Sequence, residues 1–127
     1  MKADHCPNMN TKFSYLYRDA GNNKSHAAVV FKGAFKPEDT ERLRRAFDSS
    51  TYFIAEQVGL PVAYLFTQGY EFDEVIDHCY HEFDDKELTD EQSTDARTID
   101  EFVTRVEREA ASGWNVPDSW FLHRRFE

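Results

Sequence analysis

Long apolar runs are missing from this chain. No window approaches twenty consecutive apolar residues, and charged residues make up 31% of the 127 positions, which excludes a membrane-spanning helix. The N-terminus also lacks the basic start and apolar stretch of a secretory signal. We therefore expect a cytoplasmic protein.

Cysteine is scarce, because Cys6 and Cys79 are the only two in the chain. Thiols in cytoplasmic proteins usually stay reduced, so we expect no structural disulfide. Cys6 falls within residues 1–11, which precede the first patterned segment and are expected to form a flexible N-terminal extension.

Basic charge is in short supply and unevenly distributed. The chain has 15 Lys and Arg against 24 Asp and Glu, which gives a net charge of −9. Residues 71–101 contain two basic and thirteen acidic residues, so this quarter alone carries −11. Direct nucleic-acid binding is not expected, because phosphate contacts need a basic surface. An acidic surface attracts basic proteins or cations instead.

Catalytic signatures are also absent. The sequence has no G-x-S-x-G elbow, no P-loop and no calcium-loop pattern. Cys79 and His81 would share one face of a strand, but their acidic surroundings disfavour a reactive thiolate. We therefore assign no catalytic residue and no cofactor, and favour a protein without enzymatic activity.

Aromatic residues are abundant, at 15% of the chain, and their spacing predicts the first strands. Residues 12–19 carry an aromatic side chain at every second position from Phe13 to Tyr17, which is typical of a β-strand. Gly and Asn in residues 20–24 predict a turn. The apolar run at 26–33 then predicts a second strand, antiparallel to the first.

Helix signals occur at two places. Pro37 suits the first turn of a helix, and an apolar stripe around Leu43 predicts about three turns. Thr98 and Glu101 form a capping box at the start of a second helix, and Gly113 supplies its end.

The segments between the helices predict further strands. Residues 52–54 and 62–66 are rich in β-formers around a Gly-Leu-Pro turn, although the first could continue as a helix through 55–57. Alternation in 77–85 predicts a strand that runs into an acidic loop. Residues 86–97 lack apolar periodicity and predict a solvated loop.

Together these elements predict one α+β domain over residues 12–127. The expected order is β-β-α-β-β-β-α, with a mostly antiparallel sheet of four to five strands and two helices packed on one face.

A metal site is the alternative interpretation of one segment. His78, Cys79 and His81 offer nitrogen and sulfur ligands, with Asp77 or Glu82 as possible oxygen donors. A strand sends His78 and His81 to opposite faces, and zinc needs three or four ligands. A metal-binding or small enzymatic accessory protein is therefore the alternative function.

The leading hypothesis is a non-enzymatic interaction protein that presents an acidic face to a basic protein partner. Inhibitors and immunity proteins of nucleases, or of other nucleic-acid-binding enzymes, place carboxylates where phosphates would bind, and opposite charge speeds association. Aromatic residues at the rim would act as anchors. The predicted partner-binding residues are Glu71, Asp73, Glu74, Asp84, Asp85, Glu87, Tyr70, Phe72 and Tyr80.

The predicted hairpin tip is a second candidate for ligand binding. Polar side chains gather there, although turns are polar for backbone reasons as well. The residues of this tip are Arg18, Asp19, Asn22, Asn23 and Lys24.

Three segments of the chain resemble a family of small uncharacterised bacterial proteins. The matching segments are 13–20, with the pattern F-x-Y-L-Y-R-D-A, 53–58, with F-I-A-E-Q-V, and 77–83, with D-H-C-x-H-E-F. The resemblance covers most of residues 12–120. It implies an origin in bacteria or a mobile element, and it brings no activity and no catalytic residue.

Overall fold

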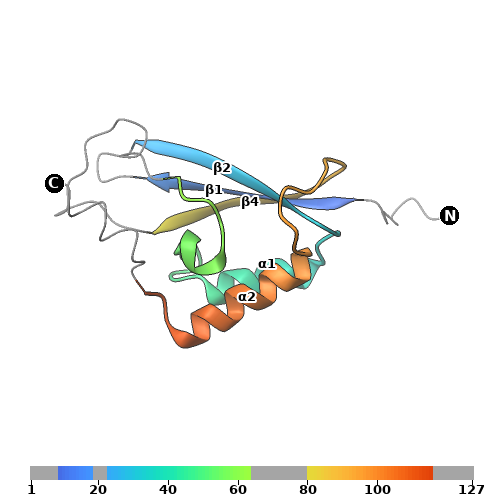
Figure 1. Ribbon diagram of the computed structural model, residues 1–127. Coiled ribbons are helices and arrows are strands. Elements are labelled where there is room, and N and C mark those ends of the chain that lie inside the picture. The colour runs from blue at the N-terminus through green and yellow to red at the C-terminus, as the bar shows by residue number, and fades with distance from the viewer. Residues whose placement is uncertain (1–8, 19–22, 64–79, 116–127) are drawn as a thin grey trace.

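An antiparallel sheet of four strands, in the order β2-β1-β4-β3, forms one layer of the protein. The computed structural model describes residues 9–18, 23–63 and 80–115. The strands are β1 (Asn10–Arg18), β2 (Lys24–Phe31), β3 (Tyr52–Phe53) and β4 (His81–Thr89). Helices α1 (Pro37–Ala46) and α2 (Ile99–Ser112) lie side by side on one face of this sheet (Figure 1). The predicted α+β class, with a mostly antiparallel sheet and two helices, is confirmed.

Strands β1 and β2 form the predicted antiparallel pair, with Phe13 opposite Val29. The side chains of Phe13, Tyr15 and Tyr17 are all 0% exposed, so the predicted aromatic face of β1 is the buried one. β1 begins at Asn10, two residues before the expected start.

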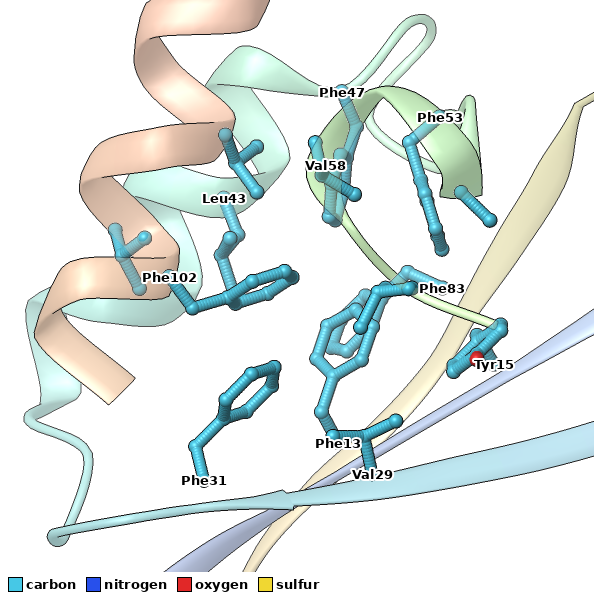
Figure 2. Close-up of a cluster of buried hydrophobic side chains, with 14 of the residues drawn as sticks. Phe13, Tyr15, Val29, Phe31, Leu43, Phe47, Phe53, Val58, Phe83 and Phe102 are labelled. Carbon is cyan, nitrogen blue, oxygen red and sulfur yellow. The ribbon is translucent and has the colours of Figure 1, made fainter. Parts of the chain in front are cut away.

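Aromatic rings from both layers meet in the core, and Figure 2 shows them between the sheet and the helices. The ring centroid of Phe13 lies 5.2 Å from that of Phe83 and 5.1 Å from that of Phe102. Phe31 stacks on Phe102 at 4.4 Å. Each such pair contributes about 0.5–1.5 kcal/mol beyond the burial of its area. One cluster therefore joins three strands to α2.

The capping box predicted for α2 is confirmed. The Glu101 backbone N–H donates to Thr98 Oγ1 at 3.1 Å, and the Thr98 N–H donates to Glu101 Oε1 at 2.8 Å. Gly113, at φ 102°, ends the helix in a backbone conformation that favours glycine. The side chains that α2 buries are Ile99, Phe102, Val103 and Val106.

Helix α1 also follows its prediction. Pro37 is its first residue, where the missing N–H costs no intrahelical hydrogen bond. The buried Asp39 accepts a hydrogen bond from the Lys36 N–H at 2.8 Å, and Leu43 is completely buried.

The predicted strand at 62–66 is wrong for the two residues that the structure describes. Val62 and Ala63 lie outside any strand, and 64–66 fall outside the described residues. The Ala63 N–H donates to Nε2 of the buried His81 at 2.9 Å. A side chain therefore satisfies this backbone donor, and no neighbouring strand does.

The alternative helix at 55–57 is present as the short 3₁₀ helix η1 (Ala55–Val58). Gly59 ends it at φ 74°, in the left-handed region. Arg97 donates to the carbonyl oxygens of Val58 at 2.8 Å and Gly59 at 3.1 Å. Arg97, two residues before α2, therefore holds the end of η1 in place.

The loop predicted to start at residue 86 is also wrong at its beginning, because β4 continues to Thr89. The longer β1 supplies the missing partner, with Lys12 opposite Glu87 and Asn10 opposite Thr89. Backbone pairing thus holds this acidic segment extended without an apolar pattern.

Candidate protein-binding surface

A β-bulge in β4 determines the face of the sheet on which its acidic side chains lie. Ser14 lies opposite Asp85 and Tyr15 lies opposite Phe83, so Asp84 is an extra residue in β4. Such an insertion interrupts the alternation of side chains between the two faces. Phe83 is buried towards the helices, whereas Asp84 and Asp85 are both exposed. The bulge thus gives two adjacent carboxylates to the face opposite the helices, called the outer face below.

Glu87 extends this row along the outer face. Asp84, Asp85 and Glu87, called the β4 carboxylates below, are all exposed. None of them forms an ion pair with another residue that the structure describes. Lys12, which faces Glu87 across the strands, pairs with Glu91 at 3.4 Å instead. Their negative charge is therefore available to a partner.

A fourth carboxylate of β4 is neutralised within the sheet. Glu82 accepts hydrogen bonds from Arg18 Nε at 2.9 Å and from Arg18 Nη2 at 3.3 Å. Two bonds to one guanidinium fix the orientation of both side chains. Glu82 is thus paired with Arg18 within the sheet.

Three other described carboxylates of the acidic quarter lie near the start of α2. Asp95 is 2.8 Å from Arg97, whose side-chain hydrogen bond lowers the pKa of this carboxyl. Asp100 is 3.6 Å from Arg42, and Glu101 caps the helix. Part of the acidic quarter therefore supports the start of α2, and another part is exposed on β4.

The predicted partner-binding residues fall into two groups. Asp84, Asp85 and Glu87 lie together as described, and Tyr80, just before β4, is half-buried against Tyr17 and its neighbours. The others lie outside the described residues; these are Glu71, Asp73, Glu74, Tyr70 and Phe72.

The segment predicted as an alternative metal site is described only in part. His81 is 0% exposed, and its Nε2 lone pair accepts the hydrogen bond from Ala63, so a metal ion at this nitrogen would have to displace that bond. His78 and Cys79 fall outside the described residues. Among the described residues, no group of three or more His, Cys, Asp and Glu side chains could hold a metal ion.

The hairpin tip is likewise described in part. Arg18 is bound to Glu82, and Asn23 and Lys24 are exposed. Asp19 and Asn22 lie outside the described residues. Arg18 of the predicted tip is therefore already hydrogen-bonded to Glu82 within the sheet.

A shallow hollow on the outer face is a feature that the sequence did not reveal. Ser14 and Ala28 lie opposite each other on β1 and β2, and both side chains are small. The hollow, of about 340 Å³, is lined by these two residues together with Lys12, His26 and Asp84. One β4 carboxylate thus borders a recess large enough for the end of a side chain.

No protein-family model, curated protein or solved structure matches this chain. The resemblance to a bacterial family therefore stays a prediction. Within the described part of the chain, no helix is long and apolar enough to cross a membrane.

Proposed function

We propose that this protein is a non-enzymatic inhibitor or immunity-type protein that binds a basic protein partner through the outer face of its sheet. The partner class that fits is a nuclease or another nucleic-acid-processing enzyme, whose site carries positive charge for phosphates. The observation that supports this most is the row of β4 carboxylates, exposed and without an ion pair among the described residues.

Electrostatics would act first on the rate of association. Exposed carboxylates gathered on one surface attract a basic partner over about one Debye length, roughly 8 Å at physiological ionic strength. Steering of this kind raises association rates by about 10-fold to 1,000-fold and weakens as salt is added. A rigid strand also holds its carboxylates at fixed spacing, which reduces the entropy lost on binding.

The hollow would add specificity to this attraction. The Asp84 carboxylate and the Ser14 hydroxyl are hydrogen-bond acceptors at its wall, and both suit an ammonium or guanidinium group. A Lys or Arg side chain of the partner would enter the hollow, while Asp85 and Glu87 receive neighbouring cations.

The test begins with affinity purification of the partner from the host and its identification by mass spectrometry. The purified partner is then titrated with the wild-type protein and with the double variant Asp84→Lys, Asp85→Lys. We expect the reversal to weaken binding by at least about 10-fold, because it replaces attraction by repulsion on the same strand.

A matched control carries the same charge change away from β4. The double variant Glu38→Lys, Asp48→Lys alters two exposed carboxylates outside the sheet face. It should bind within about 3-fold of the wild type, because only the general charge differs. Equal losses in the two double variants would contradict a docking role for β4.

A further inference from the structure

One end of the β2 edge is closed by backbone hydrogen bonds. The chain that leads to α2 covers β2 near Val30, at its C-terminal end. The backbone N–H groups of Thr94 and Asp95 donate to the Val30 carbonyl at 2.9 and 3.1 Å, and the Val30 N–H donates to Thr94 Oγ1 at 2.9 Å. Lys32 continues this closure, since it accepts from the Ile99 N–H at 2.8 Å. No further strand can pair with this part of β2.

The opposite edge, along β4, is open over most of its length. β3 pairs only with His81 and Glu82, and one more bond joins the Phe83 N–H to the Thr51 carbonyl at 2.9 Å. Beyond Phe83, no backbone group of β4 has a hydrogen-bond partner on this edge among the residues described. The side chains of Asp84, Asp85, Glu87 and Leu88 are exposed there.

An unpaired strand edge is a template for another extended segment, because alternate N–H and C=O groups point away from the sheet. The open part of β4, residues 84–89, spans about 20 Å at roughly 3.4 Å per residue. This length accommodates five or six residues of a partner strand. We call this stretch the open β4 edge.

The side chains beside the open β4 edge define what such a strand must carry. On the outer face, its side chains would lie about 5 Å from the β4 carboxylates, which selects Lys or Arg at every second position. On the face towards the helices, they would meet Leu88, which is 41% exposed, and Lys86. Lys86 Nζ lies 3.1 Å from the Phe35 ring centroid, so mainly its aliphatic stem remains for contact, which favours apolar residues.

A second copy of this chain fits the edge poorly. Antiparallel pairing of two β4 strands would bring the β4 carboxylates of both copies onto the same face, and like charges in adjacent strands destabilise a sheet. The charge pattern therefore resists self-association and favours a basic strand.

From the open β4 edge and the charge beside it, we infer that an extended basic segment of the partner protein adds to β4 as a fifth strand. This inference rests on the proposed function and specifies how the partner is held. Backbone hydrogen bonds to β4 provide affinity, and alternating Lys or Arg side chains of the partner provide selectivity.

The test uses the whole protein and a synthetic seven-residue peptide, Lys-Val-Lys-Thr-Lys-Val-Lys, with blocked ends. A control peptide has the same side chains but is N-methylated at all seven residues, so that it keeps its charge and none of its residues can donate a backbone hydrogen bond. Amide chemical shifts and hydrogen exchange are measured by NMR. We expect the first peptide to slow amide exchange within residues 84–89, and N-methylation to weaken binding by at least about 10-fold.

Each other outcome overturns strand addition. If both peptides bind equally and salt weakens both, the acidic surface binds by charge alone, and the proposed function survives without the added strand. If neither peptide perturbs residues 84–89 at millimolar concentration, a basic strand is not the occupant. If the peptide-free protein dimerises with slowed exchange in β4, a second copy occupies the edge.

Discussion

Charged residues serve different purposes on the helices and on β4. On the helices, Arg42 Nη2 lies 2.6 Å from Glu107 Oε1, and its Nη1 lies 3.5 Å from Asp39 of the same helix and 3.6 Å from Asp100. On β4, the three exposed carboxylates have no such partner among the described residues. Ion pairs on the helices therefore support the fold, whereas the β4 carboxylates leave a local excess of negative charge at the surface. The comparison suggests that stability and binding depend on separate residues.

The largest effect on stability is expected in the core between the sheet and α2. Phe102 is completely buried and contacts Phe13 and Phe31, so Phe102→Ala should lower the free energy of unfolding by about 3–5 kcal/mol. Urea denaturation measures this loss. The control Arg108→Ala, on the exposed side of the same helix, should stay within about 0.5 kcal/mol of the wild type. Similar losses in the two variants would show that the core does not dominate the stability of this layer.

A smaller effect is expected from the ion pairs of Arg42. Arg42→Ala removes contacts with three carboxylates and leaves the buried Asp39 without its guanidinium neighbour. We expect a loss of about 1 kcal/mol, because these pairs are only partly shielded from water. Arg45→Ala, whose side chain is 70% exposed, should cost less than half as much. If the two variants unfold alike, charge pairing between the helices contributes no stability.

The pH dependence of stability should report the same pairs. The hydrogen bond from Arg42 lowers the pKa of Glu107, so its stabilising effect is present at neutral pH and is lost as the pH falls through the depressed folded-state pKa. Glu107→Gln should be less stable than the wild type by about 0.5 kcal/mol at pH 7, and this difference should shrink between about pH 5 and pH 3. Denaturation at several pH values measures it. A difference that does not change with pH would assign the effect to packing.

The smallest effect on stability is expected at the β4 carboxylates. Asp84→Asn with Asp85→Asn removes two like charges without changing the shape of the side chains, so the unfolding free energy should rise slightly, by no more than about 0.5 kcal/mol. Thermal or urea denaturation at low salt shows whether the free energy of unfolding rises or falls. A clear loss of stability would mean that these carboxylates support the fold, and the contrast between the two regions would fail.

The elements that could be predicted from sequence are those whose local chemistry agrees with the fold. The capping box at Thr98 marks the start of α2, and aromatic alternation from Phe13 marks β1, because both patterns act within a few residues. The end of β4 could not be found this way, since it owes its extended form to hydrogen bonds with β1, which is distant in sequence.

The candidate site was predictable in composition and not in geometry. Asp84, Asp85 and Glu87 stand out by their charge, but the bulge that turns Asp84 and Asp85 to one face depends on the register between β1 and β4. Simple alternation would have placed these two neighbours on opposite faces. The hollow beside Ser14 and the open β4 edge also depend on which strands are neighbours, and this order is not encoded in any single segment.

The most direct test of the central claim is the ionic-strength dependence of the association rate with the purified partner. It is measured by stopped flow for the wild type, for Asp84→Asn with Asp85→Asn, and for the matched control Glu38→Gln with Asp48→Asn. Our account predicts a rate that falls steeply with salt for the wild type and the control, and a much flatter dependence when the two β4 carboxylates are removed. Identical salt dependence in all three proteins would contradict it.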